Sequence, residues 1–438
     1  MADMRSSISV ERERAILAAA LLDGLDLDPR DPLAELRSLA DTAGAVPVAS
    51  VTQTRRAPDA STFIGQGKVE ELAELAREHD AQVVIFENDL SPAQLRNVEE
   101  VVERKVIDRS ELILDIFAGR ARTHEARLQV ELAQLEYTYP RLRAMWSHLE
   151  RIAGGAPAGI GTRGPGEQQL EIDRRIVQRR KAELKREIEK VQARKQREVA
   201  GRNIDFFTVG LVGYTNAGKS TLFNTLTDAK VYADDKLFAT LDTRTRRWDL
   251  GGGDSVMLSD TVGFVRHLPH HLVASFRATL EESIHSDLLL AVLDVSDPQA
   301  QRQLETVNQV LEQIGAGDRP RLLLLNKIDR LAEPSDVLTW TTQHPDALAI
   351  SAQAGLGLDA VAEAVRERQR GHNLSLTLRV PMNEGKAINF LESRARVLDR
   401  RYDTTSVDMD VQMGQRQLDQ LRATGARFEV LESPADVA

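Results

Sequence analysis

The segment GYTNAGKS at residues 213–220 constrains the fold of this chain more than any other feature. Its pattern, G-x-x-x-x-G-K-S, needs a buried strand before it and a helix after it, because that geometry turns backbone N–H groups toward a phosphate. The apolar run FTVGLVG stands before the loop, and STLFNTL follows it. We therefore predict a nucleoside triphosphate site on a doubly wound, mostly parallel sheet.

The side chains of this loop suggest how the triphosphate is held. Lys219 supplies positive charge to the β- and γ-phosphate oxygens, and Ser220 offers its hydroxyl to Mg²⁺. The amide oxygen of Asn216 can hold K⁺ beside the phosphates; alternatively, Asn216 only stabilises the loop. We expect the phosphate contacts to come from Gly213, Tyr214, Thr215, Asn216, Ala217, Gly218, Lys219, Ser220 and Thr221.

Two segments that follow later strands indicate that the base is guanine. In NKID, Asp329 can accept hydrogen bonds from the N1–H and N2–H₂ groups of guanine, and adenine has no matching donors. We expect Asn326 to help order the loop and to reach O6 of the base, and the stem of Lys327 to cover the face of the base. In SAQ, which begins at Ser351, the N–H of Ala352 can donate to O6. Each short segment alone is compatible with an ordinary turn, but their order at strand ends favours a guanine site.

The chemistry at the γ-phosphate requires a metal and a second loop. Asp260 ends the strand VMLSD, where it can hold Mg²⁺ through water, and the N–H of Gly263 can meet the γ-phosphate. A hydroxyl from the stretch before this strand completes such a site. We expect it from Thr240, with Thr243 as the alternative, although both can be plain strand-edge residues. The predicted metal ligands are Ser220, Thr240 and Asp260, and the predicted catalytic residues are Lys219, Thr240 and Gly263.

Phe264 follows the DTVG turn, at the position where many GTPases carry a glutamine that orients the attacking water. A phenyl ring has no polar atom. The sequence therefore predicts slow intrinsic hydrolysis, with the water positioned by the backbone, by another ion or by a partner.

The 438-residue chain is too long for one hydrophobic core, and its patterns predict an α/β multidomain protein. We expect an N-terminal α/β domain that carries a long antiparallel helical hairpin, the nucleotide-binding domain, and a small C-terminal α+β domain. The predicted boundaries are a mobile or loosely helical extension at 1–40, an α/β subdomain at 41–122, the hairpin at 123–200, the nucleotide domain at 203–371 and the C-terminal domain at 372–438.

The predicted hairpin has an apolar seam, a basic flank and a glycine-rich tip. Leu128 and Leu132 begin a coiled-coil spacing on the first helix, and Leu184 and Ile188 lie on an apolar row of the second. The second helix carries eleven Lys or Arg against five acids over residues 173–198. Most such runs are solvated helix faces, but this excess favours an anionic partner. A tip without bulky side chains suits close approach to folded RNA.

Composition excludes several classes of protein. The chain has no Cys, so it contains no disulfide and no thiolate metal site. No apolar run reaches the roughly 18 residues of a membrane span, and the N-terminus lacks the apolar core of a secretory signal. A net charge of −10 argues against a general nucleic-acid coat but allows local basic surfaces. We expect a cytoplasmic monomer without a membrane span.

Several of these motifs together resemble one family. GIGTRGPGE, GYTNAGKSTLFN, LFATLD, DTVGFVRHLP and NKID are similar to the motifs of HflX, a family of ribosome-associated GTPases in the phosphate-loop class that includes Obg and Era. FIGQGKVEEL at 63–72 and the segment at 106–137 resemble its N-terminal domain, so the likeness covers about residues 45–420. In one departure, Asp242 is followed by Thr243 and Arg244, where relatives usually have Pro-Thr.

The resemblance implies GTP hydrolysis stimulated by the large (50S) ribosomal subunit, and splitting or rescue of stalled ribosomes. It also implies that the hairpin tip reaches ribosomal RNA in the peptidyl-transferase region, and that the N-terminal domain has a second, ATP-related activity. We expect peripheral membrane association as well. Two other readings stay open: an RNA-remodelling ATPase regulated by GTP, and a non-catalytic ribosome-binding brake on translation. The expected RNA contacts are Arg163, Gly164, Gly166, Arg174, Arg175, Arg179 and Arg180.

Overall fold

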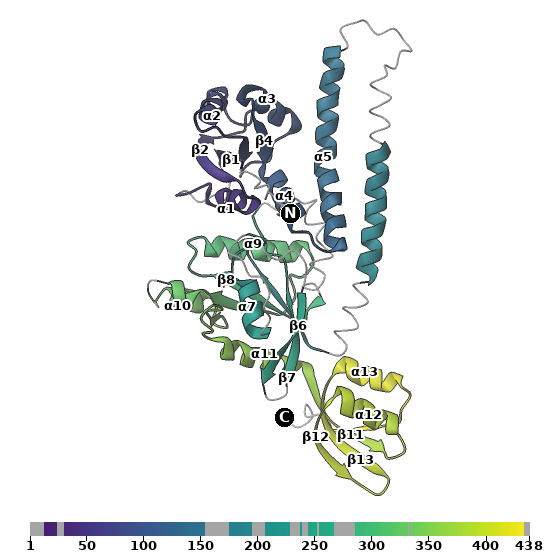
Figure 1. Cartoon of the computed structure of the whole chain (residues 1–438). Coiled ribbons are helices and arrows are strands. Elements are labelled where there is room, and N and C mark those ends of the chain that lie inside the picture. Colours follow the sequence, from purple (N-terminus) through teal and green to yellow (C-terminus); the bar gives the residue numbers. More distant parts are fainter. Residues whose placement is uncertain are drawn as a thin grey trace, which may run out of the picture.

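The computed structural model describes residues 13–23, 30–153, 175–194, 206–227, 237–238, 244–251, 254–266, 285–331, 333 and 335–432. Figure 1 shows an N-terminal α/β domain, a nucleotide-binding (G) domain and a C-terminal domain, which follow one another along the long axis of the molecule. A pair of long helices stands beside the N-terminal domain. The predicted α/β multidomain fold is therefore confirmed.

The N-terminal domain is built on a four-stranded parallel sheet with the order β2-β1-β3-β4. Its strands are β1 (Arg14–Leu22), β2 (Val46–Arg55), β3 (Val83–Phe86) and β4 (Lys105–Asp108). Buried side chains of α1 (Ala34–Ala43) and α4 (Arg109–Arg120) form the core on one face of the sheet. Those of α2 (Gln66–Glu78) and α3 (Pro92–Val102) form the core on the other face.

The prediction of a mobile or loosely helical extension over residues 1–40 is wrong for the part that the structure describes. Arg14–Leu22 forms a central strand, and α1 begins at Ala34, so a boundary at residue 41 would cut this helix. The sequence of β1, RAILAAALL, is buried on both faces of the sheet. Such an unbroken apolar run is typical of a central parallel strand, and the Arg- and Asp-rich flanks obscured it.

The hairpin consists of α5 (His124–Ala153) and a helix over residues 175–194, which lie side by side in Figure 1. Leu128 and Leu132 of α5 pack against Leu184 and Ile188 of the second helix, as the apolar spacing predicts. Ion pairs flank this seam, among them Lys185 Nζ to a Glu136 carboxylate oxygen at 3.2 Å. The predicted tip, with Arg163, Gly164, Gly166 and Arg174, lies outside the described residues.

The G domain has a six-stranded sheet with the order β10-β9-β8-β5-β7-β6. Its strands are β5 (Thr208–Gly213), β6 (Arg244–Gly251), β7 (Asp254–Asp260), β8 (Leu288–Asp294), β9 (Arg321–Asn326) and β10 (Leu348–Ala349). All neighbouring pairs are parallel except β6–β7. The sequence analysis did not predict β6, the strand at this edge of the sheet. One face packs on α9 (Ala300–Gln313); the other packs on α7 (Lys219–Thr227) and α11 (Leu358–His372). The short α10 (Ser335–Gln343) lies near β9.

The C-terminal domain is a split βαβ arrangement. Its elements are β11 (Asn373–Pro381), α12 (Gly385–Arg394), β12 (Arg396–Tyr402), β13 (Ser406–Gly414), α13 (Gln415–Ala423) and β14 (Glu429–Glu432). They form an antiparallel sheet with the order β12-β13-β11-β14. On β13, Val407, Met409, Val411 and Met413 point into the core and alternate with half-buried residues.

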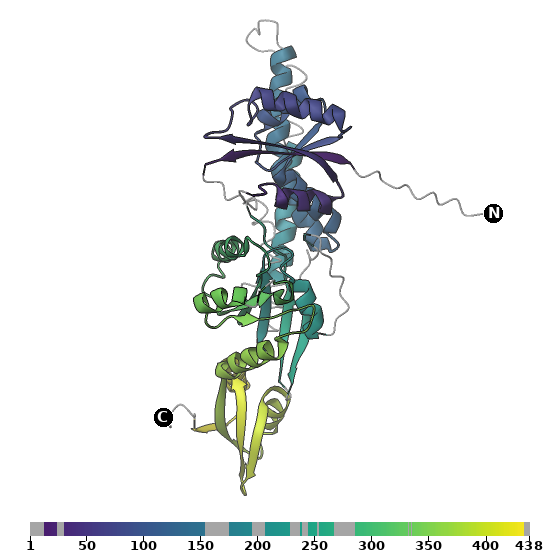
Figure 2. The same cartoon turned by 90° about the vertical axis from the view of Figure 1, so that its left-hand side faces the viewer.

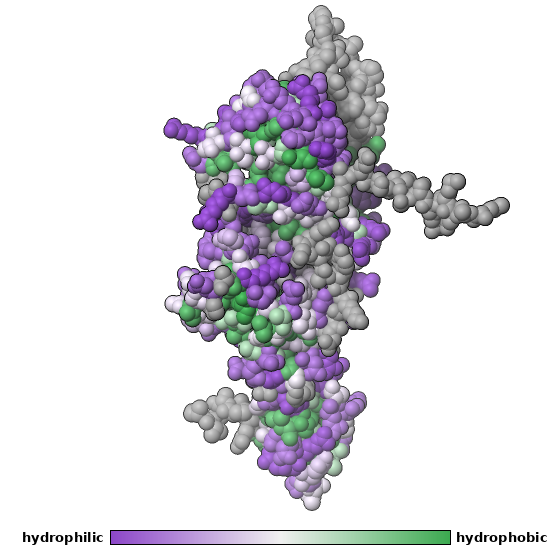
Figure 3. Space-filling model, turned by 60° about the vertical axis from the view of Figure 1, so that its left-hand side comes forward, coloured by the Kyte–Doolittle hydropathy of each residue, from purple (hydrophilic) through white to green (hydrophobic). Residues whose placement is uncertain are grey.

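Among the described helices, none is long and apolar enough to cross a membrane. On the face drawn in Figure 3, hydrophilic residues surround several separate hydrophobic areas.

Candidate functional site

The phosphate loop connects the end of β5 to the start of α7. Gly218 has a φ of +95°, and a Cβ atom there would clash with the side-chain amide of Asn326, so only glycine fits. Asn216 is exposed at a φ of +60°, a backbone conformation that asparagine tolerates better than most residues. Thr221 lies in the first turn of α7. The strand, loop and helix that the sequence predicts are thus all present.

Lys219 is buried and held over this loop. Its ammonium donates to the carbonyl oxygen of Gly213 at 3.1 Å and to that of Tyr214 at 2.6 Å. Burial lowers the pKa of Lys219 to about 8, although the carboxylate of Asp260 opposes the shift. A nucleotide phosphate next to this ammonium would favour its charged form.

Two of the three predicted metal ligands lie together. The hydroxyl of Ser220 donates to Oδ2 of Asp260 at 2.8 Å, and Asp260 is fully buried at the end of β7. A hydroxyl and a carboxylate oxygen are the donors that Mg²⁺ prefers, so this pair fits the ion. Thr240 and the alternative Thr243 lie outside the described residues. Across the described parts of the chain, no three His, Cys, Asp or Glu residues gather as a metal cluster.

The loop after β7 lies directly on the phosphate loop. The N–H of Thr215 donates to the carbonyl of Phe264 at 2.8 Å, and the N–H of Phe264 donates to that of Gly213 at 3.1 Å. A Cβ atom on Gly263 would come within 2.8 Å of the Thr215 Cα atom and 2.9 Å of Lys219 Nζ, so any larger residue would force the loop apart. Gly263 and Lys219, both predicted at the γ-phosphate, are therefore neighbours.

The predicted base-binding segments meet through Asn326. Its side-chain N–H donates to the carbonyl of Ala217 at 2.7 Å, and its Oδ1 accepts from the N–H of Ala352 at 2.9 Å. Asn326 thus joins the phosphate loop to SAQ, in keeping with the ordering role expected of it. The Ala352 N–H, expected at guanine O6, is bonded to this side chain here. Buried Ser351 accepts a hydrogen bond from the N–H of Ala354 at 3.0 Å.

The two charged residues of NKID have different surroundings. Lys327 has a φ of +64°, and its ammonium pairs with Asp294 at 2.7 Å. Asp329 is exposed in a short 3-10 turn (Ile328–Arg330), and its carboxylate has no hydrogen-bond or ion-pair partner among the described residues. This carboxylate is therefore available to a ligand.

A buried ion network between the N-terminal and G domains escaped the sequence analysis. Arg109 donates to both carboxylate oxygens of Glu87 at 2.8 and 2.9 Å and to Glu35 at 2.6 Å. Glu35 also accepts from the Tyr214 hydroxyl at 2.8 Å and from Arg266 Nε at 2.7 Å. Burial raises the pKa of Glu87; burial also acts on Glu35, but Arg109 and Arg266 hold its pKa below the usual range. No local pattern could reveal partners up to 231 positions apart.

The described candidates for RNA contact lie on the second hairpin helix. Arg180 makes two hydrogen bonds to Glu131 of α5, at 2.7 and 2.9 Å, so it joins the two helices. Arg179 pairs with Glu183 on its own helix at 3.1 Å, but its side chain is 84% exposed. Arg175 is also exposed. Part of the predicted basic flank is therefore neutralised within the hairpin.

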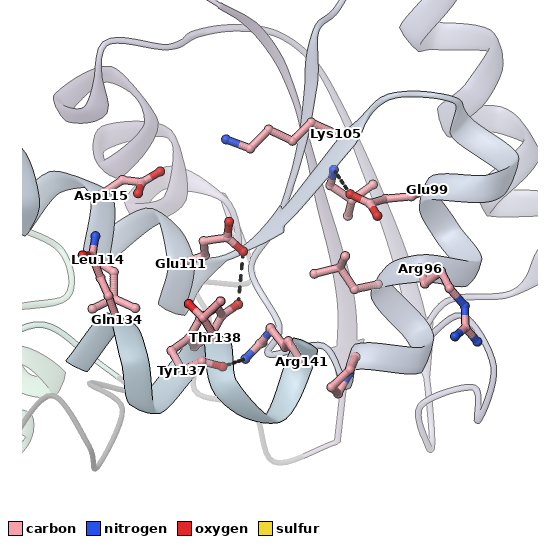
Figure 4. Close-up of a pocket in the computed structure, with 13 residues that line it drawn as sticks. Arg96, Glu99, Lys105, Glu111, Leu114, Asp115, Gln134, Tyr137, Thr138 and Arg141 are labelled. Carbon is pink, nitrogen blue, oxygen red and sulfur yellow. Dashed lines mark hydrogen bonds between the residues drawn. The ribbon is translucent and has the colours of Figure 1, made fainter. Parts of the chain in front are cut away.

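Figure 4 shows a cavity of about 440 Å³ in the N-terminal domain, between α3, β4, α4 and α5. Burial raises the pKa of three carboxylates in its wall, those of Glu99, Glu111 and Asp115. On its α5 side, Tyr137 and Arg141 each bond to Asp108, at 2.6 and 2.7 Å. These two bonds fasten α5 to the N-terminal domain.

Three family models match successive parts of the chain. "GTP-binding GTPase N-terminal" matches residues 30–118, "GTP-binding GTPase Middle Region" matches 120–202, and "50S ribosome-binding GTPase" matches 208–327. Among solved structures, a complex of SsGBP with GDP covers 81% of this chain and 98% of its own, with 23% identity and a TM-score of 0.47.

Curated relatives match over nearly their whole length. GTPase HflX of Escherichia coli K12 is 47% identical over 393 residues, which cover 89% of this chain and 91% of the relative. GTPase HflX of Lacrimispora saccharolytica is 42% identical over 400 residues, covering 91% and 93%. With a phosphate loop, a Ser220–Asp260 pair and an available Asp329 on one sheet edge, this chain belongs to the HflX family of GTPases.

Proposed function

We propose that this protein binds and hydrolyses GTP, binds the 50S ribosomal subunit, and splits or rescues stalled ribosomes. One observation carries the nucleotide part: the ends of β5, β7, β9 and β10 bring Lys219, the Ser220–Asp260 pair, Asn326 and Asp329 to one edge of the sheet. Membership of a family whose G domain matches a "50S ribosome-binding GTPase" supports the ribosomal part.

In this proposal each residue has a defined task. Lys219 and the loop N–H groups bind the β- and γ-phosphates, while Ser220, Asp260 and Thr240 hold Mg²⁺. Asp329 accepts two hydrogen bonds from guanine. Phe264 is 2% exposed and packs into the domain interface, so its ring takes no part in orienting water. Hydrolysis by the isolated protein is therefore slow, and the ribosome supplies what the site lacks.

The decisive experiment measures GTP turnover by the purified protein with and without 50S subunits. We expect slow turnover alone and a clear increase with 50S, together with splitting of 70S ribosomes followed by light scattering. Lys219→Ala should abolish both hydrolysis and its stimulation. If 50S subunits leave turnover unchanged in K⁺ and in Na⁺ buffers, the proposed function is wrong.

The same experiment separates the two other readings. An RNA-remodelling ATPase regulated by GTP would still release ribosomes with ATP alone after Asp329→Ala. A non-catalytic brake would still inhibit translation after Lys219→Ala. We expect neither variant to retain these effects. The ATP-related activity stays a proposal without assigned residues, because the sequence of the N-terminal domain shows no pattern typical of a phosphate site.

Potassium is proposed as a second ion, bound through the amide oxygen of Asn216. The exposed position of Asn216 on the phosphate loop supports this assignment. We expect faster GTP turnover in K⁺ than in Na⁺, and we expect Asn216→Ala to remove the difference. Equal rates in the two salts would contradict the proposal.

The hairpin is proposed to enter ribosomal RNA with its tip and its outer basic side. Exposed Arg175 and Arg179 lie on the described part of that side, and Arg186 and Lys190 have no partner among the described residues. Replacing Gly164 and Gly166 by Val should leave GTP binding unchanged but weaken subunit splitting. We also propose that the protein is a monomer, and that it is located in the cytoplasm with peripheral membrane association. Light scattering tests the oligomeric state, and cell fractionation tests the location.

A further inference from the structure

The N-terminal domain contacts the G domain at three segments around the nucleotide site. Tyr214 comes from the phosphate loop, Phe238 from the stretch before Thr240, and Phe264 from the loop after β7. All three lie in one apolar cluster with Phe117 of α4, whose ring meets that of Phe238 edge-on with centroids 4.5 Å apart. Figures 1 and 2 both place α1 and α4 on the side of the N-terminal sheet that faces the G domain. The N-terminal domain therefore covers the part of the G domain that responds to nucleotide.

Glu35 is the polar centre of this contact. It lies in the first turn of α1, and its side chain is 12% exposed. One carboxylate oxygen accepts from Tyr214, the second residue of the phosphate loop, and the other from Arg266, three residues after Gly263. The Tyr214 hydroxyl also accepts from the backbone N–H of Arg266 at 2.9 Å. A single carboxylate of the N-terminal domain thus fixes both loops.

In this arrangement the loop after β7 is closed on the phosphate loop. Gly263 lies against Lys219, and Phe264 is hydrogen-bonded to Gly213 and Thr215. A γ-phosphate oxygen that bonds both to Lys219 and to the N–H of Gly263 must fit between these groups. In the coupling proposed below, the loop makes this room by moving away from Lys219, and Arg266 moves with it. That movement opposes the bonds that Arg266 and Tyr214 make to Glu35.

We propose that Glu35 is a positioning residue through which the N-terminal domain favours a guanosine diphosphate over a triphosphate in the G domain. This inference rests on the proposed function only in requiring that the G domain bind guanine nucleotides. Coupling between two binding events is reciprocal, so a bound triphosphate weakens the contact between the domains by the same factor.

The test compares nucleotide affinities of the full-length protein without ribosomes. The dissociation constants of GDP and of a non-hydrolysable GTP analogue are measured in Mg²⁺ and K⁺ for wild type and Glu35→Gln. We expect the analogue to gain at least about fivefold relative to GDP in the variant, the lower end of typical coupling factors. An unchanged ratio would overturn the proposal, because a merely structural role of Glu35 alters both affinities alike.

Variants on the other side of the interface provide a test that does not depend on how Glu35→Gln folds. Arg266→Gln should shift the affinity ratio in the same direction, and the double variant should add little to either single change, because both remove one interaction. Full additivity would contradict a shared mechanism. Arg37→Gln is the matched control: Arg37 also lies on α1 in an ion pair, with Asp31 at 2.8 Å, but it is exposed.

Hydrogen exchange provides a second readout, because it reports on the local stability of α1, which affinity measurements do not. The analogue should speed amide exchange in α1 relative to GDP in the wild-type protein, and Glu35→Gln should remove this difference. If wild type binds neither nucleotide, the proposed function and this coupling both fail. If both nucleotides bind, but Glu35→Gln leaves the ratio of their affinities unchanged and the analogue leaves amide exchange in α1 unchanged, the coupling alone fails.

Discussion

The parallel sheet of the N-terminal domain and the mostly parallel sheet of the G domain differ in what lies at the carboxyl ends of their strands. In the G domain, β5, β7 and β9 end in the loops that carry Lys219, Asp260 and Asp329. In the N-terminal domain, β3 and β4 end next to Glu87 and Arg109, which join the G domain through Glu35. The same edge, where open α/β sheets commonly bind ligands, thus faces a nucleotide in one domain and another domain in the other.

The difference lies in what each edge leaves unsatisfied. Asp329 and Asn216 are exposed and present oxygen atoms to solvent. Glu87 and Arg109, in contrast, are buried and bond to each other. An edge with available polar atoms accepts a small ligand, whereas an edge with paired charges accepts a surface that completes the pairing. The first three predictions below test the two sides of this contrast, and the last applies the comparison of polar and apolar contacts to the hairpin.

The largest effect is expected for Arg109→Leu. Removing this guanidinium leaves the buried Glu87 carboxylate without its ion-pair partner and leaves Glu35 with Arg266 alone, which costs about 3–5 kcal/mol. Urea unfolding of the full chain should show this loss in the transition of the N-terminal domain. The double variant Arg109→Leu/Glu87→Leu should recover part of it, because it removes the stranded charge. A loss no larger than that of exposed Arg37→Ala would mean that the network contributes no stability.

A smaller effect, on the other sheet, is expected for Asp329→Asn. Hydrogen bonds to a charged group contribute about 1.5–3 kcal/mol, so GTP affinity should fall about 10- to 100-fold. Unfolding should be unaffected, because Asp329 has no partner among the described residues. Competition with a fluorescent nucleotide measures the affinity, and exposed Asp336→Asn serves as the control. If Asp329→Asn lowers stability but keeps GTP affinity, Asp329 serves the fold rather than a ligand, and the difference drawn between the two sheet edges is wrong.

The pH dependence of nucleotide binding should report on Lys219. Its pKa is lowered to about 8 in the nucleotide-free protein, so above pH 8 it loses its proton and must regain one when phosphates bind. GTP affinity should therefore fall as pH rises above 8, by at most about tenfold per unit. Calorimetry in two buffers of different ionisation enthalpy would detect the proton uptake. Lys219→Arg, which stays protonated, should show no such fall between pH 8 and 10.

The smallest effect is expected in the hairpin, for Lys185→Ala. The Lys185 side chain is 56% exposed and pairs with Glu136 at 3.2 Å, and such pairs contribute less than about 1 kcal/mol. Thermal unfolding followed by circular dichroism should barely change. Leu184→Ala, on a neighbouring but fully buried residue, should cost about 2–5 kcal/mol. Similar losses for both variants would indicate that the ion pairs, rather than the apolar seam, hold the hairpin.

The sequence predicted the nucleotide site better than it predicted the surroundings of that site. Strand, glycine loop and helix are local in sequence, so the positions of Lys219 and Asn326 follow from motif order alone. Glu35 could not be assigned, because its partners lie 74 to 231 positions away and no pattern links them. The strand at Arg14–Leu22 was missed for a different reason: burial on both faces removes the alternation by which strands are usually recognised.

Asp108 and Arg109 are adjacent in the chain but serve different partners. The Asp108 carboxylate anchors Tyr137 and Arg141 in the middle of α5, whereas the Arg109 guanidinium reaches the carbonyl oxygen of Arg266 at 3.2 Å. Two adjacent residues therefore connect the long helix α5 to the loop after β7 in the G domain. A displacement of α5 therefore has a short path to the loop after β7, through two side-chain hydrogen bonds to Asp108, one peptide bond and the contact of Arg109 with Arg266.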